Sequence, residues 1–322
     1  MDEFGIIARY FAPLAQDAGA FALTDDAAVI PPRPGFDLVV TTDQIAADTD
    51  FFSHDPPASV AKKALRVNLS DLAAKGATPE YYLLNLALPR SVHDAWLTEF
   101  AAGLASDQQQ FGISLLGGDT SATEGPLSVS VTAFGFVPQG RMVRRAGAKA
   151  GDAVYVTGTI GDSAGGLAIF KREKHQLTEA QRDYLTTRYQ VPEPPVGFGA
   201  HSLRGVASAS IDVSDGLIAD LEHVARASKV KIELEAEVIP RSEALRAFWG
   251  DGAEAILRAA TAGDDYQVVF TAPTGAHNEI LTAAAQTAIS VSRIGMVSAG
   301  EGVVLRHQGH VLAVHEPGYS HF

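Results

Sequence analysis

The sequence predicts a mixed α/β protein of two domains. The chain has 322 residues, which exceeds the usual size of a single domain. Helical patterns alternate with short strand-like runs along its whole length, which is typical of α/β architecture. The turn Pro138-Gln139-Gly140 and the basic stretch after it separate two such series. We therefore predict domains over residues 1–140 and 141–322.

The first predicted domain opens with a short helical pattern around Glu3 to Phe11. Two strands, over 27–30 and 38–42, flank a turn rich in Pro and Gly, so a hairpin-like start is expected. Pro56-Pro57 and Gly76 bracket a predicted helix over 56–75. The elements that follow are a strand at 81–88, a helix at 92–111, and strands at 113–116 and 127–137.

The second predicted domain alternates helices with strands. Its Pro-rich stretch from Val191 to Gly197 reads as a loop. The predicted strands cover 153–157, 208–212, 230–234, 266–271, 290–297 and 303–314. This half therefore has the same mixed α/β character as the first.

Composition excludes several classes of protein. Lys and Arg number 25 against 38 Asp and Glu, a formal charge of −13 that disfavours nucleic acid as the main partner. The absence of cysteine excludes disulfides and thiolate chemistry. The acidic N-terminus lacks the features of a signal peptide, and no apolar run reaches 20 residues. We expect a cytoplasmic protein with no membrane segment.

Aspartates recur at the ends of predicted strands, where functional sites commonly assemble. They are Asp25, Asp26, Asp43, Asp119, Asp212 and Asp215. Asp71 falls instead in the apolar later turns of the predicted helix over 56–75, where an unpaired carboxylate needs a cation. A shared Mg²⁺ would meet that need, and the neighbouring hydroxyls of Thr41, Thr42, Thr120 and Ser214 are suitable oxygen ligands.

Singly, each aspartate suits a helix cap or a turn. Together they predict several metal ions, and several metal ions point to clustered phosphates and phosphoryl transfer. The chain has no P-loop, but Gly117-Gly118-Asp119-Thr120 offers open backbone for a phosphate beside a carboxylate. Arg144-Arg145 supplies a guanidinium for phosphate contact, although a solvated loop is equally compatible with it.

One rival motif favours different chemistry. Gly161-Asp162-Ser163-Ala164-Gly165 matches the G-x-S-x-G nucleophile elbow, so a serine hydrolase is an alternative. No H-G-G-G element precedes it, and this alternative gives the upstream aspartates no role. A tight Gly-rich turn between a strand and a helix is the simpler interpretation.

In combination and order, these motifs resemble the thiamine-monophosphate kinase family, in the group that includes aminoimidazole ribonucleotide synthetase and selenophosphate synthetase. The stretches that carry the resemblance are Asp25–Val29, Thr41–Asp43, Asn68–Ala74, Gly117–Thr120, Arg145–Ala148, Asp212–Leu217 and Gly318–Phe322. The resemblance implies two mixed α/β domains of the aminoimidazole ribonucleotide synthetase-like type. The domain over 1–140 would bind ATP and metal and form a homodimer, and the domain over 141–322 would complete the active site.

The resemblance also implies roles for individual residues, with ATP and thiamine monophosphate as partners and Mg²⁺ as cofactor. The metal ligands would be Asp26, Thr41, Thr42, Asp43, Asp71, Asp119, Asp212 and Asp215. ATP would contact Gly118, Asp119, Arg145 and Ser214, and the catalytic set would be Asp71, Asp119, Arg145 and Asp212. The acceptor would lie against Asp50, Asp264 and Tyr319.

Departures from the family pattern fall mainly on the acceptor side. The family's histidine near the substrate phosphate is here Asp50, and a family glutamate is here Asp264. An ionised Asp50 would repel a phosphate dianion. The sequence therefore leaves open a related ATP-dependent kinase or synthetase with another small-molecule acceptor.

Overall fold

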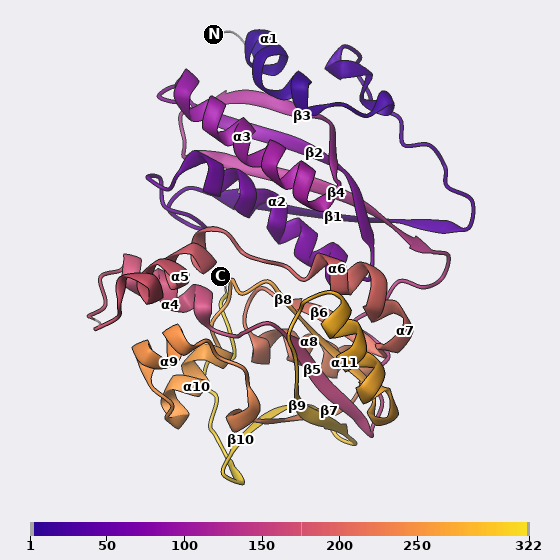
Figure 1. Cartoon of the computed structure of the whole chain (residues 1–322), viewed down its shortest axis with the longest axis vertical. Helices are drawn as coiled ribbons and strands as arrows, with labels where there is room; N and C mark the ends of the chain where they lie inside the picture. Colours follow the sequence, from indigo (N-terminus) through magenta and orange to yellow (C-terminus); the bar gives the residue numbers. More distant parts are fainter. Residues whose placement is uncertain (1–2, 175, 321–322) are drawn as a thin grey trace. The chain divides into compact units, whose positions relative to one another are not determined.

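The computed structural model describes residues 3–174 and 176–320, and its contacts divide the chain into two compact units (Figure 1). Unit 1 comprises residues 1–72 and 77–140, and unit 2 comprises residues 73–76 and 141–322. His321 and Phe322, the end of the tail motif, lie outside the described residues. Both units combine helices with a β-sheet, so the predicted mixed α/β class is confirmed.

Unit 1 contains a four-stranded sheet in the order β1-β4-β2-β3. The strands are β1 (Phe36–Ala46), β2 (Thr78–Pro89), β3 (Ser114–Thr123) and β4 (Ser128–Pro138). β4 runs antiparallel to both β1 and β2, whereas β2 and β3 are parallel. The parallel pair needs a crossover, which the chain makes through α3 (Asp94–Phe111).

Helices α2 (Pro57–Ala74) and α3 cover one face of this sheet (Figure 1). The two helices approach closely, since a Cβ at Gly103 would lie 2.6 Å from the Ala58 carbonyl oxygen. Arg66 on α2 also donates to both carboxylate oxygens of Asp107 on α3 at 2.8 Å, and the pair is buried. These contacts hold α2 in place, and α2 carries Asp71.

The chain before β1 differs from the predicted hairpin. It forms α1 (Glu3–Ile6) and short turns of helix over Ile7–Phe11, Ala12–Leu14 and Ala18–Leu23. Residues 27–30 form no strand, and Val29 donates its backbone N–H to the Gly19 carbonyl oxygen at 2.9 Å. The prediction is wrong: the backbone of residues 27–30 packs against the preceding turns of helix, and β1 pairs with β4 instead.

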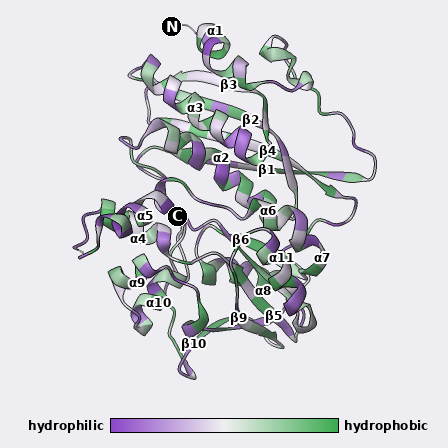
Figure 2. Cartoon of the chain, in the orientation of Figure 1, coloured by the Kyte–Doolittle hydropathy of each residue, from purple (hydrophilic) through white to green (hydrophobic). Residues whose placement is uncertain are grey.

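Unit 2 contains a seven-stranded sheet in the order β11-β10-β7-β9-β5-β8-β6. The strands are β5 (Asp152–Thr157), β6 (Ala209–Val213), β7 (Lys231–Glu235), β8 (Gln267–Pro273), β9 (Val291–Ser298), β10 (Gly302–His307) and β11 (His310–Val311). Only β10 and β7 are parallel among the described pairs. β5 and β6 are buried along their whole length, and their hydrophobic residues are apparent in Figure 2.

Helices surround this sheet and cover its core. They are α4 (Asp162–Phe170), α5 (Glu179–Gln190), α6 (Val196–Phe198), α7 (Arg204–Val206), α8 (Leu217–Ser228), α9 (Glu243–Trp249), α10 (Ala253–Ala260) and α11 (His277–Gln286). Shorter turns of helix lie at Gly199–Leu203, Ala236–Val238 and Thr274–Ala276. α8 packs its buried residues, Leu217, Leu221 and Val224 among them, against β6 and β7.

The predicted strand over 303–314 is instead a tight hairpin. Gln308 and Gly309 both have positive φ, at 51° and 78°, so the chain reverses and His307 pairs with His310. Positive φ at both central residues is the geometry of a two-residue hairpin turn. Among the described residues, no helix has the length and apolar character needed to cross a membrane.

Candidate active site

In unit 1, three of the predicted metal ligands, Thr41, Asp43 and Asp71, meet at the junction of β1 and α2. Thr41 and Asp43 alternate along β1 and therefore share the face that α2 covers. The Thr41 hydroxyl donates to Asp71 Oδ2 at 2.5 Å, and both Asp43 and Asp71 are half-buried. Burial and then the negative charge of Asp71 raise the pKa of Asp43 to about 6. In the described part of the chain, no basic side chain lowers the pKa of Asp43 against these two effects.

The other predicted ligands of unit 1 do not join these three residues. Thr42 points to the opposite face of β1, where its hydroxyl donates to the Val131 carbonyl oxygen at 3.1 Å. Asp26 is exposed in the loop before β1. Asp119 is exposed on β3, at the far edge of the sheet from β1, and three strand spacings make that distance about 14 Å. Residues 3–174 and 176–320 contain no group of three carboxylates or imidazoles able to hold a metal ion.

Gly118 is required by packing within the sheet. Its φ is 151°, and an added Cβ would lie 1.7 Å from the Leu84 carbonyl oxygen on β2. This close approach accounts for the glycine even without a phosphate beside it.

In unit 2, the loop after β6 is fixed by one buried carboxylate. Asp220 on α8 accepts hydrogen bonds through Oδ2 from the backbone N–H groups of Ser214, Asp215 and Gly216, at 3.0, 3.1 and 3.1 Å. Burial and the charge of Asp215 raise the pKa of Asp220 to about 7, although the three N–H groups act in the opposite direction. Because Asp220 already accepts from these three amides, they are not available to a phosphate near this loop, whereas the Ser214 hydroxyl is a possible donor.

The predicted acceptor residues of unit 2 lie against the same loop. Asp264 donates its backbone N–H to the Ser214 carbonyl oxygen at 2.8 Å, and Tyr319 donates its own to the Asp215 carbonyl oxygen at 2.9 Å. Asp264 also accepts a hydrogen bond from the Tyr266 hydroxyl at 3.2 Å. Asp212 is buried at the end of β6, just before the loop. Unit 2 thus brings together Asp212, Ser214, Asp215, Asp264 and Tyr319.

Asp50 is the predicted acceptor residue of unit 1, and its carboxylate has a local structural role. Its Oδ2 accepts from the Ala46 N–H at 2.8 Å, while its own N–H donates to the Ala46 carbonyl oxygen at 2.9 Å. The buried Lys63 ammonium donates to the Asp50 carbonyl oxygen at 2.7 Å. This nearby positive charge reduces the repulsion that Asp50 would exert on a phosphate.

The G-x-S-x-G stretch forms the start of α4, with Gly161 as the residue before the helix, and Asp265 holds it in place. The carboxylate of Asp265 accepts from the N–H groups of Gly161 and Ser163, at 2.6 and 3.3 Å. The Ser163 side chain is 1% exposed, and its Oγ has no hydrogen-bond partner among the described residues. A nucleophilic serine must contact a base and reach its substrate, so this geometry disfavours the hydrolase alternative.

Sequence reasoning missed the residues that position these loops. Asp220 and Asp265 act through backbone N–H groups, which leave no trace in residue spacing. For Asp220 the only available signal was its position four residues after Gly216, at the start of a helix, where carboxylates commonly bond the backbone of the preceding loop. Asp265 was missed because the sequence analysis assigned the binding role to its neighbour, Asp264.

Comparison with known proteins supports the resemblance over nearly the whole chain. Residues 24–137 match the family model described as AIR synthase related protein, N-terminal domain, and residues 149–308 match the corresponding C-terminal domain. The thiamine-monophosphate kinase of Caulobacter vibrioides is 41% identical over 99% of this chain and 90% of its own length. That of Escherichia coli K12 is 38% identical over 99% of this chain and 98% of its own length.

Solved structures of thiamine-monophosphate kinases are also similar to this chain. The crystal structure of thiamine-monophosphate kinase from Stenotrophomonas maltophilia K279a has a TM-score of 0.83 and 38% identity, and the match covers 90% of this chain and 91% of that one. The structure of AaThiL complexed with AMPPCP and TMP has a TM-score of 0.79 and 32% identity, with 91% and 89% of the two chains covered.

Proposed function

This chain belongs to the thiamine-monophosphate kinase family, and on that premise we propose that it transfers the γ-phosphoryl group of ATP to the phosphate of thiamine monophosphate. The names of the relatives and the AMPPCP and TMP bound to AaThiL support these two substrates. An oxygen of the acceptor phosphate would attack the γ-phosphorus in line, the bond to the β,γ-bridging oxygen would break, and ADP would leave with thiamine diphosphate as product.

The observation that carries this proposal is the pair of half-buried carboxylates, Asp43 and Asp71, without a basic partner in the described residues. The donors fit Mg²⁺, because they are oxygens and because Mg²⁺ usually takes one or two carboxylates together with substrate phosphates. The proposed ligands are Asp26, Thr41, Thr42, Asp43, Asp71 and Asp119 in unit 1 and Asp212 and Asp215 in unit 2. Bound Mg²⁺ would supply positive charge against the phosphate oxygens.

The remaining proposed roles follow from exposure and loop geometry. Arg145 is exposed and offers a guanidinium that matches phosphate oxygens. Ser214 presents its hydroxyl from a loop that Asp220 holds, and Gly118 and Asp119 would contact ATP from β3. Asp50, Asp264 and Tyr319 would bind the acceptor, and the loop contacts of Asp264 and Tyr319 keep these two beside Asp215.

The decisive experiment measures formation of thiamine diphosphate from ATP and thiamine monophosphate over a range of Mg²⁺ concentrations. We expect strict dependence on Mg²⁺ and near-complete loss of turnover in Asp71→Asn, because the amide keeps the shape and removes the charge. Asp37→Asn is the matched control: Asp37 lies on β1 with Asp43 but accepts a hydrogen bond from the Gly140 N–H at 2.7 Å, which an amide oxygen also accepts. Turnover in excess chelator would refute the metal proposal.

A panel of phosphorylated acceptors, assayed with ATP under the same conditions, tests the substrate. Preference for thiamine monophosphate is the expected result. Asp50→His should then raise the kcat/KM for thiamine monophosphate, because it removes a carboxylate that repels the phosphate. A lower kcat/KM would show that Asp50 matters more as the acceptor for the Ala46 N–H. Efficient phosphorylation of another acceptor only would favour the related kinase or synthetase.

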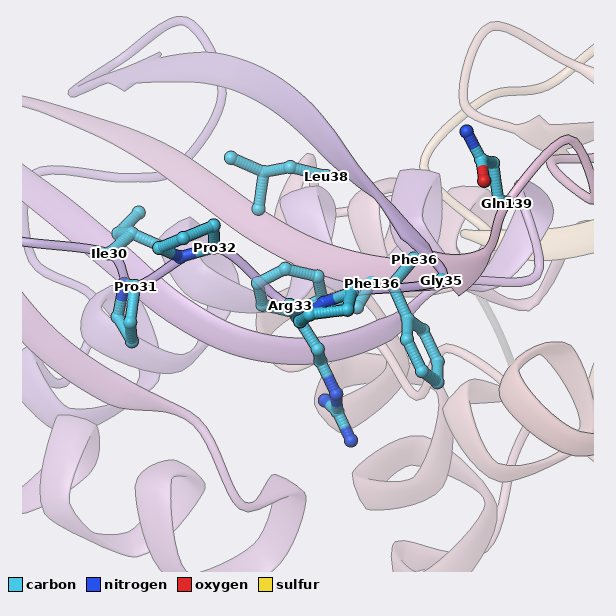
Figure 3. Close-up of a pocket in the computed structure, with 10 residues that line it drawn as sticks. Ile30, Pro31, Pro32, Arg33, Gly35, Phe36, Leu38, Phe136 and Gln139 are labelled. Atoms are coloured by element: carbon cyan, nitrogen blue, oxygen red, sulfur yellow. The ribbon is translucent and has the colours of Figure 1, made fainter.

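We also propose a homodimer formed through unit 1. β1 is an edge strand, and its alternate residues Phe36, Leu38 and Val40 are 38, 44 and 53% exposed. Phe36 and Leu38 line a pocket of about 320 Å³ together with Phe136 and the Pro31-Pro32 segment (Figure 3). An exposed apolar edge strand favours pairing with another surface, and a second copy would cover it.

Light scattering with size-exclusion chromatography tests this assembly. We expect a dimer in the parent and a monomer in Val40→Lys, because a charge on the strand face opposes burial. Val311→Lys is the control, since Val311 is 59% exposed on β11 of unit 2. A dimer that survives Val40→Lys and Leu38→Glu together would contradict the proposed interface.

A further inference from the structure

The loop over residues 144–148, which carries Arg145, is held at several backbone points in unit 2. The Arg144 carbonyl oxygen accepts the N–H of Ser210 on β6 at 2.9 Å. Gly147 lies so close to the chain before β6 that an added Cβ would be 2.3 Å from the Ser208 carbonyl oxygen, and its φ of 134° favours glycine. These contacts fix the β6 side of the loop.

Ser228, the last residue of α8, fixes the other side. Its Oγ accepts the N–H groups of Gly147 and Ala148, both at 3.1 Å. The same hydroxyl donates to the Arg145 carbonyl oxygen at 3.3 Å. One side chain therefore bonds three consecutive peptide units that begin at Arg145.

The chemistry of a hydroxyl suits this arrangement. A serine Oγ has one donor and two acceptor lone pairs, which matches one carbonyl oxygen and two N–H groups. Alanine would leave all three backbone groups without this partner, whereas threonine would retain it. Ser228 lies at the end of the helix whose first turns hold the Ser214 loop through Asp220, so α8 supports two loops proposed to meet ATP.

We propose that Ser228 is a positioning residue for phosphoryl transfer, which acts by holding the Arg145 backbone where its exposed guanidinium meets the nucleotide phosphates. This inference rests on the proposed role of Arg145 in binding ATP. Ser228 itself contacts backbone, and its effect on ATP passes through Arg145.

A double-mutant cycle tests the proposal with the affinity for AMPPCP in the presence of Mg²⁺, measured by calorimetry, and with steady-state kinetics. We expect Ser228→Ala to weaken nucleotide binding about tenfold, since each lost hydrogen bond contributes modestly. The KM for ATP should rise while the KM for thiamine monophosphate stays within about twofold, and Ser228→Thr should restore parental values. In the Arg145→Ala background, Ser228→Ala should have less than about a twofold effect, because residues that act together are not additive.

Ser298→Ala is the matched control. Ser298 is a serine of the same unit whose hydroxyl bonds the Glu233 carboxylate at 3.3 Å, so its removal should not change nucleotide binding. Equal tenfold losses from Ser228→Ala with and without Arg145 would overturn the positioning role. Unchanged AMPPCP affinity in Arg145→Ala alone would show that the proposed role of Arg145 is wrong and would remove the basis for this inference.

Discussion

Replacing Asp43 with asparagine should abolish activity while making the protein without ligands more stable at alkaline pH. Burial and the charge of Asp71 raise the pKa of Asp43 from 3.8 to about 6, so the folded protein holds this proton more tightly than the unfolded chain does. The stability of the parent therefore falls as pH rises from about 4 to about 6, and is level above that. Asparagine carries no titrating proton and escapes this loss.

The magnitude follows from the shift. Each unit of pKa corresponds to about 1.4 kcal/mol, so a shift of about two units sets a ceiling near 3 kcal/mol. Asp43 is half-buried, and water screens part of the interaction, so we expect a gain of about 1–2 kcal/mol above pH 6 that disappears towards pH 4. Urea unfolding of parent and Asp43→Asn across pH 4.5 to 8 measures it.

Two comparisons decide whether the reasoning holds. Asp37→Asn, on the same strand, is the control for the replacement of a β1 carboxylate by an amide. With Mg²⁺ and AMPPCP added, the parent should gain more stability than Asp43→Asn, because a ligand stabilises only the form that binds it. The reasoning would be wrong if Asp43→Asn were no more stable than the parent at pH 8, or if its gain in stability were the same at every pH. Either result would show that the ionised Asp43 carboxylate does not destabilise the folded protein.

The other predictions concern the buried Ser163 hydroxyl, the close packing of Gly118 and the buried ion pair of Arg66 with Asp107. Ser163→Ala should keep the kinase rate within about threefold and leave the urea midpoint unchanged or slightly higher, because the buried Oγ has no described partner; labelling of Ser163 by a fluorophosphonate probe would contradict this. Gly118→Ala should lower stability by more than about 3 kcal/mol in thermal melts, since the new Cβ meets the Leu84 carbonyl oxygen, and a normal melting temperature would refute the contact. Arg66→Met should cost about 3–5 kcal/mol in urea because it leaves the Asp107 charge buried and unpaired, and the double variant with Asp107→Leu should recover most of this loss.

Local patterns in the sequence predicted the elements well where one periodicity dominates. The helix predicted over 56–75 is α2, from Pro57 to Ala74, because its apolar spacing and flanking Pro and Gly agree. The hairpin at 27–30 failed because β1 pairs with β4, which lies much later in the chain, and local patterns do not encode such long-range pairing. The strand over 303–314 failed because positive φ at Gln308, a residue that gives no turn signal of its own, reverses the chain.

Sequence reasoning proposed the charged residues of the site but gave no role to the residues that orient the loops around them. The placement of Asp71 in an apolar helix indicated a half-buried carboxylate, and Thr41 and Asp43 do lie with it. Strand order set Asp119 at the far edge of the sheet, and strand order depends on tertiary pairing that spacing does not encode. Ser228 and Asp220 lie outside the motifs and bond backbone groups within them, at Arg145–Ala148 and Ser214–Gly216, so the motifs themselves do not identify either residue.

The three amides that bind Asp220 have a thermodynamic consequence for nucleotide recognition. Restricting the backbone of one residue costs roughly 1–2 kcal/mol of conformational entropy at 25 °C. Ser214, Asp215 and Gly216 are already restrained by the Asp220 carboxylate in the protein without ligands, so this entropy is lost when the chain folds. In the proposed binding of ATP at Ser214, the nucleotide would therefore meet a preorganised loop, and the enthalpy of its contacts there would contribute to affinity without an opposing loss of loop freedom.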